Sequence, residues 1–92
     1  MNEYLIKAED GDFLIVAPEA LHPSGYVLET IDGWGDHRVR CGSGEIAFSF
    51  EEPGIQMITE GTQSDFDDDR LAEAIRAQVQ AATGRSIILI AL

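Results

Sequence analysis

The sequence predicts an α+β domain: a strongly bent antiparallel sheet or small β-barrel of about six to seven strands, one helix packed on it, and a final buried strand. Three observations predict this class. Short apolar or alternating segments are separated by glycine and proline turns, one segment with helical periodicity follows, and an apolar run comes last. Dense turns favour antiparallel pairing, because parallel strands need long crossover connections. We expect residues 1–92 to form a single domain.

Six short strands are expected before the helix. Asp10-Gly11 is a hairpin turn signal, because a type I′ turn needs positive φ at its central residues. Ile46, Phe48 and Phe50 alternate with small residues, which is typical of a half-buried strand. The expected strands span residues 3–8, 12–17, 25–31, 36–41, 45–50 and 55–60.

The helix is expected to follow Asp67 and to end before Gly84. Leu71, Ile75, Val79 and Ala82 recur at helical spacing, so they share one face, which we expect to pack on the sheet. Asp67 is a suitable N-cap because its carboxylate can accept hydrogen bonds from amides of the first turn. Gly84 suits the left-handed position after the last turn.

Residues 87–92, Ile-Ile-Leu-Ile-Ala-Leu, contain no polar side chain. A strand with one face in water usually alternates apolar and polar residues. The run is also too short to span a membrane, which takes roughly 20 apolar residues. It therefore predicts a central strand that is buried on both faces.

The chain carries 17 acidic and six basic residues, for a net charge of −11. This charge argues against a sequence-independent grip on nucleic acid and against binding to an anionic membrane. It favours a basic protein partner, while homo-oligomerisation stays open. Because the first residues show no signal-peptide pattern, we expect a cytoplasmic protein.

No catalytic, cofactor or metal site is predicted. Asp65, Asp67 and Asp69 have the spacing of the first ligands of an EF-hand loop, but arginines occupy its sixth and twelfth positions. Capping of the helix is the favoured role. His37 and Cys41 would lie ~13 Å apart along one strand, too far for a nucleophile and its base.

The candidate partner-binding residues are of two kinds. Trp34 and Tyr26 flank a glycine-rich turn, where aromatic side chains either close the core or anchor a partner. Asp65, Asp68 and Asp69 lie where the chain enters the helix, and we expect them to attract a positive surface.

Arg38 and Arg40 form a local basic stripe. The favoured interpretation is that they pair across strands with Glu29 or Glu45. The alternative is that they bind nucleic acid.

The segment 51–92 resembles small acidic immunity proteins, which are encoded beside bacterial polymorphic toxins and neutralise them by binding. The resemblance lies in Glu51-Glu52-Pro53-Gly54, an apolar strand, an alanine-rich helix that ends in Thr83-Gly84, and an apolar last strand. It implies an immunity-type inhibitor of a basic partner, in a bacterium.

Residues 39–48, Val-Arg-Cys-Gly-Ser-Gly-Glu-Ile-Ala-Phe, resemble the second signature of Sm-like proteins, with Cys41 in place of a glycine. That resemblance implies a small SH3-like barrel that binds nucleic acid or self-assembles. A binding module is thus the leading hypothesis, the Sm-like barrel is the alternative, and an enzyme with an unrecognised site is the third.

Overall fold

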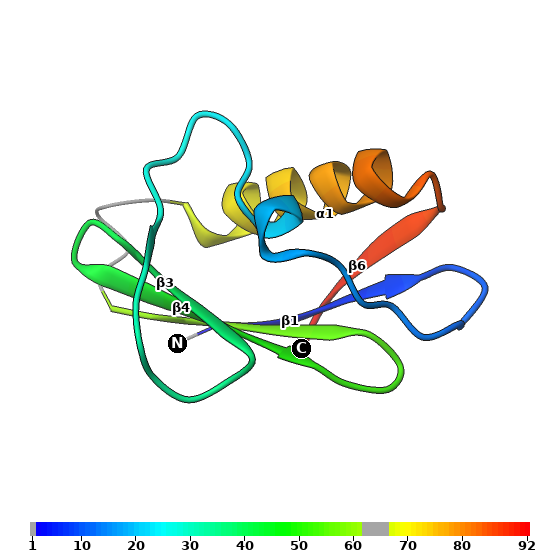
Figure 1. The fold of residues 1–92 in the computed structure, drawn as a ribbon, viewed down its shortest axis with the longest axis horizontal. Coiled ribbons are helices and arrows are strands. Elements are labelled where there is room, and N and C mark those ends of the chain that lie inside the picture. Colours follow the sequence, from blue (N-terminus) through cyan, green and yellow to red (C-terminus); the bar gives the residue numbers. More distant parts are fainter. Residues whose placement is uncertain (1, 62–66) are drawn as a thin grey trace.

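The computed structural model describes residues 2–61 and 67–92, which form an antiparallel sheet covered by helix α1 (Figure 1). The strands lie side by side in the order β2-β3-β4-β5-β1-β6. Their bounds, with those of the helices, are β1 Asn2–Ala8, η1 Pro18–Leu21, β2 Glu29–Thr30, β3 His37–Cys41, β4 Gly44–Phe50, β5 Ile55–Glu60, α1 Asp68–Thr83 and β6 Ile87–Ala91.

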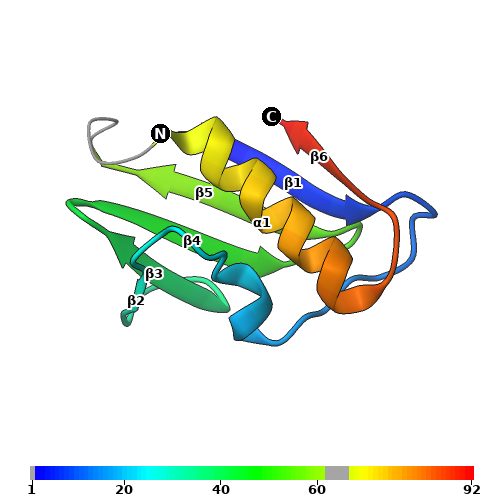
Figure 2. The ribbon, with the colours of Figure 1, turned by 90° about the horizontal axis from the view of Figure 1, so that it is seen from above.

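The α+β class with a six-stranded antiparallel sheet is confirmed, but the sheet is not closed. Within the described residues β2 forms one edge and β6 the other, so the architecture is an open sheet and not a barrel. Figure 2 shows the two edges on opposite sides, with α1 lying between them across one face.

Helix α1 packs on this face through Leu71, Ile75 and Val79, all fully buried, as the periodicity predicts. Ala82 was expected on the same face but is exposed, so the last turn of α1 is not covered by the sheet at that position. Both predicted ends are confirmed. The Asp67 carboxylate accepts hydrogen bonds from two first-turn amides, and Gly84 adopts φ 68°.

The expectation for the last strand is wrong: β6 is an edge strand. Ile87 is buried beneath α1, whereas Ile88 and Ile90 on the other face are 36% and 39% exposed. The helix covers only one face of the sheet, and the second apolar face of β6 is therefore left partly open. An apolar run shows that both faces of a strand could be buried, but it does not show that other elements cover both faces.

The second expected strand, residues 12–17, is not a strand in the structure. A hairpin at Asp10-Gly11 would have paired this segment with β1, but β5 and β6 already occupy both edges of β1. The segment instead packs through its side chains, with Leu14 buried and Val16 against the core. The third expected strand, residues 25–31, is reduced to β2.

Among residues 2–61 and 67–92, no helix has the length and apolar character that crossing a membrane requires.

Candidate partner-binding site

A shallow groove of about 440 Å³ lies along the N-terminal half of α1, beside the segment that leads into β2. Two predicted partner-binding residues, Tyr26 and Asp69, meet in it although they are far apart in the sequence. The other residues that line the groove are Arg70, Glu73, Ala74 and Ala77. An aromatic ring, two carboxylates, one guanidinium and two alanines thus form one surface.

Tyr26 gives the groove its aromatic wall. Its side chain is half-buried and packs against the edge of the core, so the ring is held and partly accessible at once. Ala74 and Ala77 carry only methyl groups, and this leaves room in front of the ring. A flat or aliphatic side chain fits such a space.

Asp69 is fixed in the groove by Tyr4, whose hydroxyl donates a hydrogen bond of 2.6 Å to Asp69 Oδ1. Burial of the Tyr4 ring, together with this bond and the nearby carboxylates, raises the pKa of Tyr4. The phenol therefore stays protonated as a donor across the physiological range. Asp69 itself is exposed, so a cation of a partner can reach its carboxylate.

Glu73, the other carboxylate of the groove, forms an ion pair with Arg76 at 2.7 Å. The hydrogen bonds from Arg76 lower the pKa of Glu73, and the same bonds raise that of Arg76. Both groups stay charged near neutral pH. Glu73 is only partly neutralised, since the pair is solvent-exposed.

Asp68 does not belong to the accessible surface, contrary to its expected role. The residue is 3% exposed, and its Oδ2 accepts hydrogen bonds of 2.6 Å from Asn2 and from Thr59. These bonds tie the start of α1 to β1 and β5, so the carboxylate acts inside the fold. The third expected acid, Asp65, lies outside the described residues.

Trp34 is separated from Tyr26 by the sheet. Its ring lies 5.0 Å from Arg38 Cζ, in a cation–π contact. Arg38 stands between His37 and Val39, which face the core, so strand alternation places Arg38 on the side away from α1. Trp34 is 51% exposed on that open face and takes no part in the groove.

The predicted cross-strand pairing of the two arginines is confirmed. Arg38 is buried and contacts Glu45 at 2.7 Å and Glu60 at 3.5 Å, while Arg40 lies 3.8 Å from Glu29. Arg38 is therefore enclosed by carboxylates and by the Trp34 ring. This environment leaves it poorly placed to contact a phosphate backbone.

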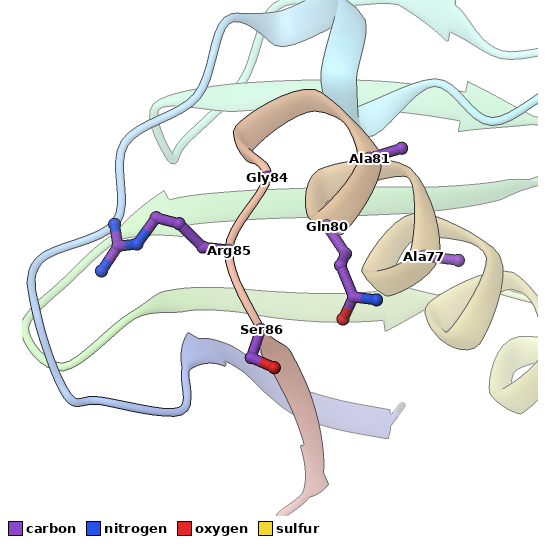
Figure 3. A pocket seen from close by; sticks show the side chains of 6 residues that line it. All are labelled: Ala77, Gln80, Ala81, Gly84, Arg85 and Ser86. Carbon is purple, nitrogen blue, oxygen red and sulfur yellow. The ribbon is translucent and has the colours of Figure 1, made fainter.

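A second hollow of about 410 Å³ lies at the other end of α1, lined by Ala77, Gln80, Ala81, Gly84, Arg85 and Ser86 (Figure 3). The Arg85 side chain points away from it, toward the loop after β1 (Figure 3). There it pairs with Asp10 at 3.1 Å and donates to the Phe13 carbonyl. The hollow thus offers alanines, the Gln80 amide and the Ser86 hydroxyl, and its one charged side chain, Arg85, is already paired.

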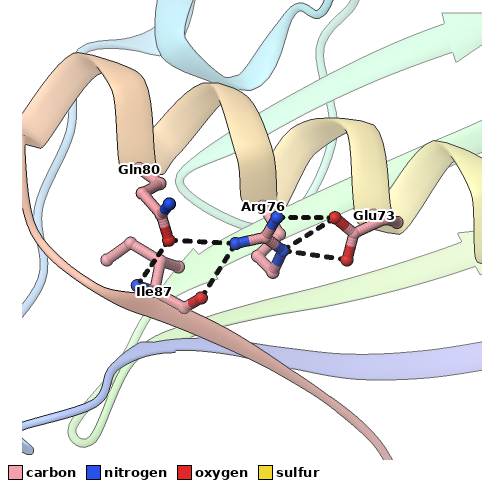
Figure 4. Close-up of polar contacts among 4 residues, drawn as sticks. All are labelled: Glu73, Arg76, Gln80 and Ile87. Atoms are coloured by element: carbon pink, nitrogen blue, oxygen red, sulfur yellow. Dashed lines mark hydrogen bonds and ion pairs between the residues drawn. The ribbon is translucent and has the colours of Figure 1, made fainter.

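Beside the second hollow, α1 is fastened to the outer edge of β6 (Figure 4). Arg76 Nη1 donates to the Ile87 carbonyl at 3.0 Å, and the Ile87 amide donates to Gln80 Oε1 at 3.1 Å. Gln80 also accepts from Arg76 at 3.0 Å. These contacts satisfy backbone groups that an edge strand would otherwise leave to water.

A pair of histidines that sequence reasoning missed joins the loop after η1 to β3. The Nε2 atoms of His22 and His37 lie 2.8 Å apart, so one ring donates and the other accepts. His37 is buried and stacks on Phe48. Burial, and then the neighbouring His22, lower the pKa of His37. No spacing motif links residues 15 positions apart, so only the fold brings them together.

No group of three or more His, Cys, Asp or Glu side chains that could hold a metal ion is found in the part of the chain that the structure describes. Cys41 is a buried residue of the core cluster, on the same strand as His37.

Comparison of the chain with known protein families, with curated proteins and with solved structures finds no match.

Proposed function

We propose that this protein is a small acidic protein-binding module that holds a basic segment of a partner protein in the groove beside Tyr26. The observation that carries the proposal is the meeting of an accessible aromatic ring with the carboxylates of Asp69 and Glu73. A lysine or arginine of the partner would place its aliphatic stem over the ring and alanines and its charge against the carboxylates. Such contacts combine burial with charge complementarity.

The distribution of charge supports the same proposal. Four of the six basic residues form ion pairs with acidic residues of the chain: Arg38, Arg40, Arg76 and Arg85. Many of the acidic side chains, among them Glu9, Asp12, Glu51 and Glu52, are exposed. The surface field is therefore negative, which accelerates encounter with a positive partner and repels nucleic acid.

The immunity-type role is the narrower form of this proposal. It rests on the resemblance of residues 51–92 to small acidic immunity proteins, and it implies a basic toxin as partner and action in the bacterial cytoplasm. The Sm-like alternative loses support because Arg38 is enclosed in the open face of the sheet. A toxin gene beside the gene for this chain would favour the immunity-type role.

The proposal is tested with a set of lysine- and arginine-rich peptides and single-stranded RNA of equal length, using calorimetry and NMR shift mapping. We expect a basic peptide to bind with shifts centred on Tyr26 and Asp69, and to bind more weakly as salt rises from about 50 to 300 mM, since the Debye length shortens. Tyr26→Ala should weaken binding by about fivefold or more, the loss typical of an interface anchor.

Asp69→Asn is the sharper variant, because the amide oxygen still accepts from Tyr4 while the charge is lost. Its matched control is Asp32→Asn, which removes the same charge from an exposed site in the loop before β3. If both variants weakened peptide binding equally, the binding would depend on the overall negative charge and not on the groove. Tight RNA binding that is lost on changing Arg38 and Arg40 would contradict the proposal and favour the Sm-like alternative.

A further inference from the structure

The two edges of the sheet are built differently. β2 is a two-residue strand whose Glu29 is exposed and paired with Arg40, and short, charged edges of this kind resist pairing with another strand. β6 has five residues and no charge, proline or glycine. It therefore lacks the features that usually protect a sheet edge.

The free backbone groups of this edge can be assigned residue by residue. Hydrogen bonds from Glu9 to Ser86 and from Leu92 to Glu3 show that even-numbered residues of β6 bond to β1. The N–H and C=O groups of Ile87, Leu89 and Ala91 consequently point outward. Those of Ile87 are taken by Gln80 and Arg76 (Figure 4), whereas those of Leu89 and Ala91 meet no partner in the described part of the chain.

We propose that β6 pairs with β6 of a second copy of this chain, antiparallel, about a two-fold axis that passes through Ile90. In this register Leu89 of each copy exchanges both backbone hydrogen bonds with Ala91 of the other. The pairing uses the groups that are free and leaves Ile87 with its helix contacts. Two six-stranded sheets become one continuous sheet.

The occupied groups at Ile87 select this register. A shift that placed Leu89 opposite Leu89 of the second copy would require Ile87 to bond with Ala91, which its contacts with Gln80 and Arg76 prevent. With Ile90 on the axis, the open face gains an Ile90–Ile90 pair flanked by two Ile88–Leu92 pairs. These three residues are 36%, 39% and 67% exposed for Ile88, Ile90 and Leu92, so pairing shelters aliphatic surface.

Charge favours a second copy over a basic partner as the occupant. A chain of net charge −11 repels its own copies in every orientation, and contact through an uncharged strand such as β6 adds the least local repulsion. A basic partner would gain nothing from an edge without acids. A two-fold interface also needs a self-complementary patch, which a uniform aliphatic strand provides.

The test measures the oligomeric state of the full chain by sedimentation velocity over a concentration series. We expect a monomer–dimer equilibrium that strengthens as salt is raised, because screening reduces repulsion between like-charged copies. Binding of a basic peptide in the Tyr26 groove changes with salt in the opposite direction. The opposite salt dependence distinguishes the two proposals, so one can fail while the other holds.

Ile90→Lys places two lysines opposite each other on the axis and should weaken dimerisation by about tenfold or more. Val27→Lys makes the same charge change at a site that is 90% exposed and remote from β6, and should leave dimerisation unchanged. Ala91→Pro removes an outward N–H without touching the bonds to β1, and should also weaken the dimer. Circular dichroism confirms that each variant is folded.

Cross-linking tests the register in a Cys41→Ala background. Non-hydrogen-bonded antiparallel pairs bring Cα atoms to about 4.5 Å, within disulfide range, so Ile90→Cys should form a cross-linked dimer under mild oxidation. Ile88→Cys should not, because its two copies would lie ~13 Å apart. A chain that stays monomeric at high salt and high concentration, or equal cross-linking by both variants, would overturn the proposal.

Discussion

The two faces of the sheet are stabilised by different means. The face beneath α1 is dry: Leu71, Ile75 and Val79 of the helix pack over fully buried strand residues such as Phe48 and Met57. Among residues 2–61 and 67–92, no helix or strand covers the open face. Near β3 it is held by buried Arg38 with its carboxylates and Trp34. Toward β6 it carries the aliphatic side chains of Ile58, Ile88 and Ile90, beside Lys7 of β1.

The difference shows that one face of this small sheet stabilises the fold while the other stays available for binding. The covered face provides the apolar burial that folds the domain. The open face contributes less burial and keeps surface available for contacts with other molecules. Variants on the two faces should therefore differ in kind as well as in size.

The largest effect is expected for Ile75→Asp on the covered face. The substitution places an unpaired carboxylate in the core and should lower the free energy of unfolding by about 4 kcal/mol or more. Ala77→Asp adds the same charge to the outer side of α1, where the residue is exposed, and should cost about 1 kcal/mol or less. Thermal unfolding measures both. Equal melting temperatures would mean that α1 does not pack on the sheet.

An intermediate effect is expected on the open face from Arg38→Met. Loss of the buried guanidinium removes its contacts with Glu45, Glu60 and Trp34 and should lower the free energy of unfolding by about 1–3 kcal/mol. The cost is no larger because the two carboxylates are partly exposed and regain hydration. Arg40→Met, two residues along the same strand and exposed, should change stability by about 0.5 kcal/mol or less. Urea unfolding measures the stability of both variants. Coinciding midpoints would contradict the expected difference between Arg38 and Arg40.

The smallest effect concerns pH and the covered face. Because burial and His22 lower the pKa of His37 in the folded protein, the unfolded chain binds its proton more readily. Stability is then fully present above about pH 6.5, the ordinary histidine value, and declines as pH falls through the folded pKa. The nearby Glu19 charge opposes this shift in part.

The measurement is the urea midpoint between about pH 7.5 and 5, a range in which Asp10 and Glu73, whose pKa values are lowered, stay ionised. His37→Gln should abolish the decline seen in the wild type over this range. A decline of the same size in the variant would assign the pH dependence to other groups.

The parts of the fold that depend on local chemistry were predictable from the sequence. The helix, its Asp67 cap and its Gly84 end follow from spacing and residue type, and so does the β5 strand, whose bounds match the expected residues 55–60. These signals lie within a few residues of one another. Cross-strand pairing of Arg38 and Arg40 with Glu29 or Glu45 was also predictable, but the partner of each was not: the register places Arg40 opposite Glu45, whereas Arg38 reaches Glu45 diagonally and Arg40 lies against Glu29.

The parts that depend on which strands become neighbours were not predictable. β1 lies between β5 and β6, so no local turn signal could show that residues 12–17 would be left without a strand partner. For the same reason the apolar run of β6 was assigned to the centre of the sheet. Of the candidate site, the sequence identified Tyr26 and Asp69 separately, but not that they share a groove, and it did not reveal that Asp68 is buried.

The position of β1 also has a consequence for how the chain folds. Tyr4 lies opposite Met57 on one side and Ala91 on the other, so both neighbours of β1 are synthesised long after it. The hairpin of β3 and β4 and the contacts of α1 with β6 join residues close in sequence, and such contacts form quickly. The pairing of β1 with β5 and with β6 joins residues far apart in the sequence, so we expect the first segment of the chain to join the sheet late in folding.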